Sequence, residues 1–130
     1  MRPLGVLSAF FLLVAGAAAA KEFPPGELMV CGATHCRVVT DAHSHALSHL
    51  LWGDRPVVRV STPPVGSPIY QLRFKTGPVG AIMSRTAIRV HGLNCGRFQR
   101  GKWYRLPHEL RGMTEGLGPK RLRRSVPRSC

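Results

Sequence analysis

The first twenty residues limit what the rest of the chain can fold into. They read "MRPLGVLSAFFLLVAGAAAA", with one positive charge at Arg2, an apolar run from Leu4 to Val14 and a small-residue end at residues 18–20. This is the pattern of a secretory signal peptide with an A-x-A cleavage site. The apolar run is shorter than the roughly 20 residues that a membrane-spanning helix needs. We therefore expect residues 1–20 to be removed on export, leaving a protein that is extracellular or in the cell envelope and has no transmembrane segment.

The remaining 110 residues are enough for one small domain with one hydrophobic core. Export exposes them to oxidising conditions, and the four cysteines form an even set, so two disulfides are expected. The four residues between Cys31 and Cys36 suit a tight hairpin closed by a disulfide. The favoured pairing is Cys31 with Cys36 and Cys95 with Cys130, although four cysteines allow three pairings. Catalytic dithiols have two intervening residues, so a redox-active pair is not indicated.

Hydrophobic periodicity predicts an α+β fold. The clearest alternation spans residues 69–76, where Tyr70, Leu72 and Phe74 lie on one face of a strand. A helix is predicted to follow a cap at Thr40 or Asp41 and to stop at Gly53. Other strands are expected at 28–31, 36–39, 55–61, 81–84 and 102–106, a second helix at 107–117, and either a strand or a helix at 86–92.

These elements amount to a small antiparallel sheet of four to six strands, packed by one or two helices. We expect them to form a single α+β domain over residues 21–118. No periodicity is left after this point, so residues 119–130 are predicted to be a basic flexible tail.

Two cysteines and four histidines lie within residues 30–49, which is the composition of a zinc site. The order Cys31-x4-Cys36 and His45-x3-His49 is that of a zinc finger, but only eight residues separate the pairs instead of about twelve. The phase of the predicted helix turns His45 and His49 toward solvent beside Asp41, whereas His43 faces the core. We favour a solvated histidine face. A metal site of Asp41, His45 and His49 and a pH-responsive contact remain alternatives.

Positive charge is the second strong signal. Residues 21–130 keep 18 of the 19 Lys and Arg and all 6 Asp and Glu, a net charge of +12. Residues 97–130 have ten basic and two acidic side chains, whereas residues 21–96 have eight and four. Such an excess favours attraction to polyanions and says nothing about the fold.

The stretch "CGRFQRGKWYRLP", residues 95–107, alternates basic with aromatic side chains. This mixture suits phosphate neutralisation with stacking on bases or sugars. The interpretation that we favour for Trp103 is an edge strand whose aromatic side chains enter the core while its cations stay in water. Together with the "KRLRR" run, the candidate polyanion-binding residues are Arg97, Arg100, Lys102, Trp103, Arg105, Lys120, Arg121, Arg123 and Arg124.

The segment from "GSPIYQLRF" through "GRFQRGKWYRLP" to "ELRGMTEGL", with the closely spaced Cys31 and Cys36 upstream, resembles small exported actinobacterial proteins of unknown function. The resemblance covers most of the chain after the signal peptide and implies a bacterial envelope or extracellular location. It supplies no catalytic residues. Cys95, Cys130 and the "HSHALSH" stretch are not features of that pattern.

Nothing in the sequence points to an enzyme. The six carboxylates are scattered, so no pair for glycoside chemistry is evident, and neither a nucleophile elbow nor a phosphate loop is present. We expect a non-enzymatic binding module without a cofactor. Its expected partners are anionic envelope polymers or an anionic membrane surface, with nucleic acid as a further candidate. The rival hypothesis is a metal-binding protein or small metal-dependent hydrolase that uses Asp41, His45 and His49.

Overall fold

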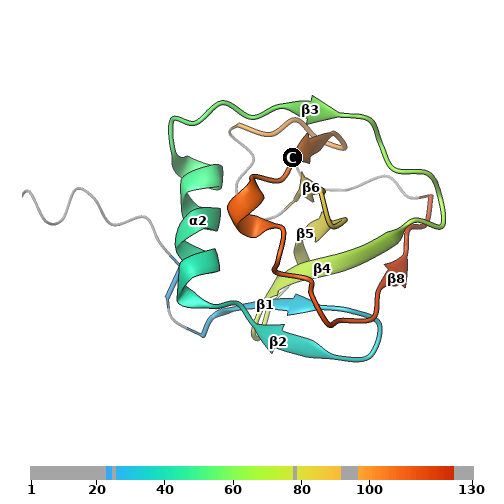
Figure 1. Ribbon diagram of the computed structural model, residues 1–130, viewed down its shortest axis with the longest axis horizontal. Helices are drawn as coiled ribbons and strands as arrows, with labels where there is room; N and C mark the ends of the chain where they lie inside the picture. The colour runs from blue at the N-terminus through green and yellow to red at the C-terminus, as the bar shows by residue number, and fades with distance from the viewer. Residues whose placement is uncertain (1–22, 25, 78, 92–96, 125–130) are drawn as a thin grey trace, which may run out of the picture.

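The computed structural model describes residues 23–24, 26–77, 79–91 and 97–124 (Figure 1). In this part of the chain one α-helix accompanies an antiparallel sheet with the strand order β2-β1-β4-β5-β6-β7-β3, and an eighth strand, β8, pairs with β4. The elements are β1 (Leu28–Cys31), β2 (Cys36–Val38), α2 (Asp41–Trp52), β3 (Arg59–Val60), β4 (Pro68–Phe74), β5 (Val79–Met83), β6 (Ala87–Val90), β7 (Trp103–Arg105), the 3-10 helix η2 (His108–Leu110) and β8 (Lys120–Arg121).

The sheet is larger than the four to six strands predicted from the sequence. The strand predicted over residues 55–61 is shortened to β3, and β8 lies in a segment predicted to have no structure. Both strands have two residues, which is too short to show an alternation of polar and apolar side chains. Residues 86–92, ambiguous in the sequence, contain β6, which pairs with β5 and β7.

The predicted disulfide hairpin is confirmed. Cys31 and Cys36 are direct partners in the antiparallel β1–β2 register, with their Cα atoms 4.0 Å apart and their sulfur atoms bonded. Cys95 and Cys130, the other predicted pair, lie outside the described residues.

Helix α2 begins and ends where the sequence predicts. The hydroxyl of Thr40 accepts a hydrogen bond from the His43 backbone N–H at 3.2 Å, and the Gly53 N–H donates to the His49 carbonyl at 2.9 Å. These contacts satisfy backbone groups that the helix ends leave without partners, and an N-cap of this kind stabilises by about 1 kcal/mol. Leu47, Leu50 and Leu51 are buried against the sheet, so the helix is fixed on its apolar side.

Both faces of the sheet are covered by apolar contacts. Along β4, Tyr70 and Leu72 enter the main core between the sheet and α2. Ile69, on the opposite side of β4, enters a second cluster on that side, which we call the outer face of the sheet. Figure 1 shows α2 and η2 together on the core side. The second cluster consists of Ile69, Ala87, Trp103 and Leu122, with Val60 and Ile82 packed against it.

The C-terminal part of the chain differs from the prediction in two ways. The helix expected over residues 107–117 is only the single turn η2, followed by further turns in which Gly116 has a φ of +80°. Glycine disfavours a continuous helix and permits this backbone conformation, so the glycine-rich stretch turns instead. The predicted flexible tail begins with β8, and the Leu122 N–H donates to the Ser67 carbonyl at 2.9 Å. Residues 125–130 lie outside the description.

Within the described ranges, no helix has both the length and the apolar character needed to cross a bilayer.

Candidate anion-binding groove

A row of paired residues runs across the outer face of the sheet. Cys31 is the register partner of Gln71, Gln71 of Ile82, and Ile82 of Arg89. Directly paired residues in antiparallel strands place their side chains on the same face. The outer face therefore combines a disulfide, an amide, an aliphatic side chain and a guanidinium in one line from β1 to β6.

A groove of about 680 Å³ opens beside this row, between β8 and the outer face. Its apolar lining comes from Ala33, Ile69, Ile82, Pro119 and Leu122, and Gln71 contributes an amide. Lys120, Arg121 and Arg123 supply the charge, and none of the described lining residues is acidic. The structure thus brings three of the predicted polyanion-binding residues together, two on β8 and one just after it.

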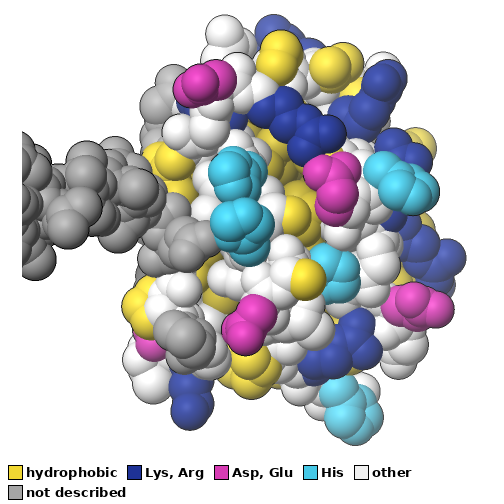
Figure 2. Space-filling model, turned by 60° about the vertical axis from the view of Figure 1, so that its left-hand side comes forward, with side chains coloured by type: hydrophobic (Ala, Val, Ile, Leu, Met, Phe, Trp, Pro, Cys, Tyr) yellow, Lys and Arg dark blue, Asp and Glu magenta, His cyan; other side chains and the backbone are white. Residues whose placement is uncertain are grey.

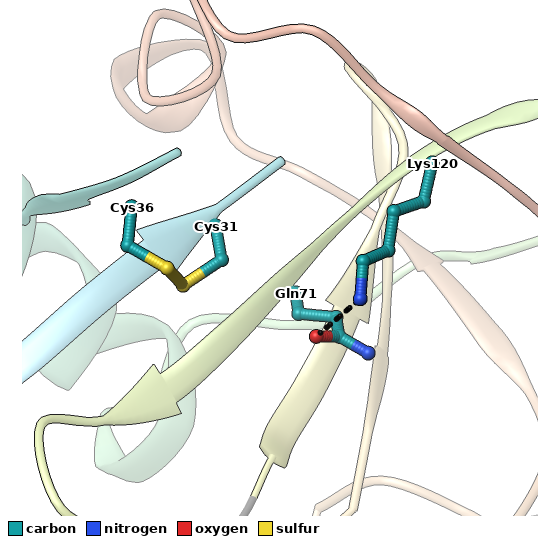
Figure 3. Close-up of a disulfide and its surroundings, with 4 residues drawn as sticks. All are labelled: Cys31, Cys36, Gln71 and Lys120. Atoms are coloured by element: carbon teal, nitrogen blue, oxygen red, sulfur yellow. Dashed lines mark hydrogen bonds between the residues drawn. A yellow bond between two sulfur atoms is a disulfide. The ribbon is translucent and has the colours of Figure 1, made fainter. Parts of the chain in front are cut away.

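The disulfide hairpin holds the segment that leads into β8. The Ala33 N–H donates to the Gly118 carbonyl at 2.8 Å. A Cβ atom at Gly32 would clash with that same carbonyl oxygen, so the close approach of the two backbones requires glycine there. Lys120 Nζ then donates to Gln71 Oε1 at 3.2 Å, next to the disulfide (Figure 3). These contacts tie one wall of the groove to the hairpin turn.

The aromatic side chains of residues 95–107 are not available for stacking. Trp103 is 1 % exposed and belongs to the second cluster. Phe98 is buried against Tyr104, with the rings in an edge-to-face arrangement and their centroids 5.0 Å apart. The stacking interpretation is therefore wrong for Trp103, and the prediction that it is buried is confirmed. The prediction of an edge strand is wrong, because β7 lies between β6 and β3.

The cations of the same stretch separate into different environments. Arg97 is half-buried, and its guanidinium donates to the Leu50 carbonyl near the C-terminal end of α2. A cation there also interacts favourably with the helix dipole, so Arg97 has a structural role. Arg100, Lys102 and Arg105 are exposed, as are Arg123 and Arg124.

Sequence reasoning missed a buried cation on the outer face. Arg89 is only 7 % exposed, and its guanidinium carbon lies 5.6 Å from the centroid of the Trp103 ring. Burial lowers the pKa of Arg89. The sequence left residues 86–92 as either a strand or a helix, so it gave Arg89 no position. The burial of Arg89 depends on Trp103, which lies on another strand, and this contact could not be predicted.

His91, two residues after Arg89 in the chain, is half-buried. Its pKa is lowered, first by desolvation and second by the positive charge of Arg89. Within the described residues, the Nε2 atom of His91 and the Nε atom of Arg89 are buried without a hydrogen-bond partner.

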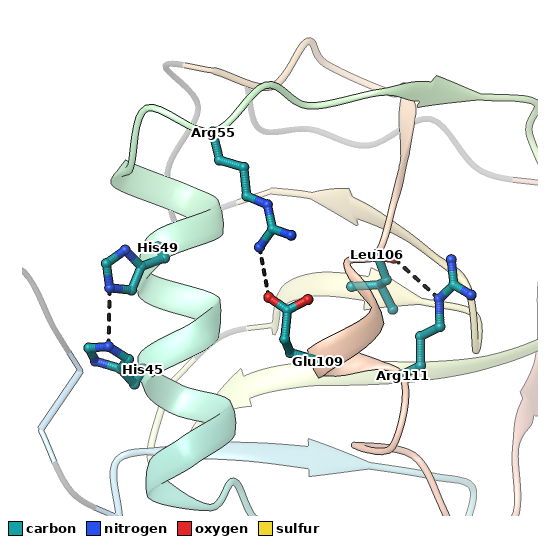
Figure 4. A network of polar contacts seen from close by, with 6 residues as sticks. All are labelled: His45, His49, Arg55, Leu106, Glu109 and Arg111. Atoms are coloured by element: carbon teal, nitrogen blue, oxygen red, sulfur yellow. Dashed lines mark hydrogen bonds and ion pairs between the residues drawn. The ribbon is translucent and has the colours of Figure 1, made fainter.

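The solvent side of α2 carries the predicted histidine face. His45 and His49 are exposed, their Nε2 atoms lie 3.1 Å apart and share a hydrogen bond, and their rings meet edge to face (Figure 4). Figure 2 shows that histidines on this side lie among side chains of both charges. No three His, Cys, Asp or Glu side chains of the described ranges gather to hold a metal ion. The alternative three-ligand metal site of Asp41, His45 and His49 is therefore not assembled.

His43 lies on the other side of α2, where the helix phase had placed it, but it is half-buried rather than enclosed in the core. It lines a pocket of about 340 Å³ with Arg37, Met113 and Glu115 among others. Arg37 donates to the Met113 carbonyl at 2.7 Å, which joins β2 to the turns after η2.

An ion pair connects the end of α2 to η2. Arg55 Nη1 lies 2.7 Å from Glu109 Oε2, and both side chains are about half exposed (Figure 4). The hydrogen bond from Arg55 holds the pKa of Glu109 below its ordinary value. This pair gives Arg55 a carboxylate partner, whereas the described lining of the groove contains none for its cations.

Comparison of this chain with family models, curated proteins and solved structures found no match. A function therefore has to be argued from the chemistry of these surfaces.

Proposed function

We propose that the protein is an exported, non-enzymatic module that binds anionic partners, and that the groove beside β8 is its binding site. The observation that supports this most is the groove lining, whose described residues combine three cations with apolar side chains and include no carboxylate. Lys and Arg side chains supply affinity for phosphate groups through charge neutralisation and counterion release. An apolar floor adds contact area for the uncharged parts of the same partner.

Other pockets of the described residues are less suited to an anion. The pocket beside His43 contains Arg37 but also Glu115. A third pocket contains Arg85 and Arg111, and Glu115 lines it as well. A carboxylate in the same pocket offsets the attraction of the cations for an anionic ligand. The groove is therefore the better candidate on charge alone.

The partner that fits best is a repeating phosphodiester, as in anionic envelope polymers. Consecutive residues 119–123 line the groove, so it follows β8 and suits an extended chain. The net charge of +12 on residues 21–130 supports long-range attraction to such a polymer. If the signal peptide functions as proposed, the protein meets these polymers and anionic lipid surfaces outside the membrane.

Two matched triple variants test the groove. The first replaces Lys120, Arg121 and Arg123 by Gln, and the second replaces the exposed Arg100, Lys102 and Arg105 by Gln. Both remove three positive charges, so they differ only in position. We expect the first variant to elute at lower salt from an anionic resin and to bind a phosphodiester polymer more weakly than the second. If the first variant is retained as strongly as the unmodified protein, the groove is not the binding site.

Equal losses in the two variants would also contradict the assignment, because net charge alone would then explain binding. A separate measurement with anionic vesicles and with the soluble polymer distinguishes a lipid surface from a polymer as the partner. Binding to vesicles without binding to the polymer would mean that the partner is a lipid surface and not a polymer.

A further inference from the structure

The paired histidines of α2 form a feature that anion binding does not use. His45 and His49 are one helical turn apart, the spacing at which side chains lie side by side on one face. The backbone that positions them is fixed by the Thr40 cap and by the burial of Leu47, Leu50 and Leu51. Both imidazoles are thus placed by a rigid element and not by a loop.

We propose that His45 and His49 chelate one divalent transition-metal ion through their Nε2 atoms. Imidazole nitrogen binds zinc at about 2.0–2.1 Å. With the observed Nε2–Nε2 separation of 3.1 Å, bonds of that length give an N–metal–N angle of about 100°. This angle lies between the right angle of octahedral or square-planar coordination and the wider tetrahedral angle. The two nitrogens therefore already have the separation of neighbouring ligands on one ion.

Binding requires a small chemical change in the pair. Without an ion, one Nε2 atom donates its hydrogen to the other. A bound ion takes the place of that hydrogen, which in a neutral imidazole moves to Nδ1 of the same ring. A metal ligand must be deprotonated at the coordinating nitrogen, so binding releases or relocates one proton.

The ligand type selects the class of ion. Imidazole suits Zn²⁺, Cu²⁺ and Ni²⁺, whereas Mg²⁺ and Ca²⁺ prefer oxygen ligands. Figure 4 shows the two rings on the side of α2 away from η2, while Glu109 is directed to Arg55. Among the described residues, no third His, Cys, Asp or Glu side chain gathers with the pair. The site is an open chelate that exchanges its ion readily, with Cu²⁺ bound more tightly than Ni²⁺ or Zn²⁺.

The test is a calorimetric titration of the purified chain, free of any added histidine tag, with CuCl₂, ZnCl₂ and MgCl₂. We compare His45→Ala, His49→Ala and the double variant with His43→Ala, a histidine on the same helix that lies outside the pair. Loss of an outer-shell partner of a metal ligand costs about 10- to 100-fold in affinity. Loss of a ligand itself should therefore weaken Cu²⁺ and Zn²⁺ binding at least about tenfold.

We expect one Cu²⁺ or Zn²⁺ per chain, no heat from Mg²⁺, and unchanged affinity in His43→Ala. Circular dichroism checks that the variants keep the helix, which exposed alanines should preserve. Absence of Cu²⁺ and Zn²⁺ binding by the unmodified chain overturns the proposal. Undiminished binding by the double variant overturns it too, because the ion would then be held elsewhere.

Discussion

At the scale of single residues, the outer face of the sheet combines buried charge with buried polarity. Arg89 is covered and lies over the Trp103 ring, and the half-buried His91 follows two positions later, directly after β6. A cation over an indole ring gains on the order of 0.5–2 kcal/mol, depending on how far it is desolvated. The same positive charge acts against a second charge at His91. The pair therefore makes the protein sensitive to acidification.

His91 should reduce stability as the pH falls. Its pKa is lower in the folded protein than in the unfolded chain, because of burial and of Arg89. Between the two pKa values the unfolded chain binds a proton that the folded protein does not, so the free energy of unfolding decreases as the pH drops below about 6.5. We expect His91→Gln to reduce this loss. Urea unfolding at pH 7.5 and pH 5 measures it.

The control for this measurement is His108→Gln, which removes an exposed histidine from η2. If the stability of His91→Gln declines between the two pH values as steeply as that of the unmodified protein, His91 is not the responsible group.

At the scale of elements, the disulfide hairpin supports β8 as well as itself. The turn between Cys31 and Cys36 contains Gly32 and Ala33, which contact Gly118 just before β8 begins. Ala33 also lines the groove. A change in the conformation of the hairpin should therefore alter the groove, because Gly32 and Ala33 contact Gly118 just before β8.

Replacing Cys31 and Cys36 by Ala should lower the free energy of unfolding by about 2 kcal/mol, the value expected for opening so short a loop. It should also weaken binding of an anionic polymer, because the segment before β8 loses its fixed support. Urea unfolding and a polymer titration measure the two effects.

The matched control is Thr40→Ala, which removes the cap of α2 and should cost about 1 kcal/mol. Thr40 does not line the groove. Similar losses of polymer affinity in the two proteins would show that general destabilisation, and not the hairpin contact, is the cause.

Elements defined by local chemistry could be predicted from the sequence. The hairpin follows from the spacing of Cys31 and Cys36, and α2 from Thr40, Gly53 and a 3.6-residue apolar repeat. The two-residue strand β8 could not be predicted, because its pairing with Pro68 and Ile69 is a contact between distant parts of the chain. For the same reason the sequence named three cations of the groove but not the surface on which they meet.

For the histidine pair too, one feature could be predicted from the sequence and another could not. Helical phase correctly turned His45 and His49 toward solvent. The distance between their rings depends on side-chain rotamers, which periodicity does not determine. The alternative metal site considered from the sequence therefore included Asp41 as a third ligand, whereas the structure brings together the two imidazoles.

At the scale of the whole molecule, the sheet separates two surfaces of different chemistry. The cationic groove lies on the outer face, and the histidine pair lies on α2, which packs on the core side. The two proposed sites share no lining residue. An anionic polymer and a metal ion could thus bind the same molecule without competing for a side chain.

The salt dependence of polymer binding decides whether the groove or the overall charge is responsible. Each phosphate contact with a single-stranded polymer contributes about −0.7 to the slope of log K against log salt, so the three groove cations predict a slope of about −2. Attraction spread over the net charge of +12 gives a steeper slope. Affinity for a single-stranded phosphodiester polymer, measured over a range of NaCl concentrations, distinguishes these cases. We expect the shallow slope, and its near disappearance when Lys120, Arg121 and Arg123 are replaced by Gln. A slope several times steeper, unchanged in that variant, would mean that the polymer contacts the basic surface as a whole.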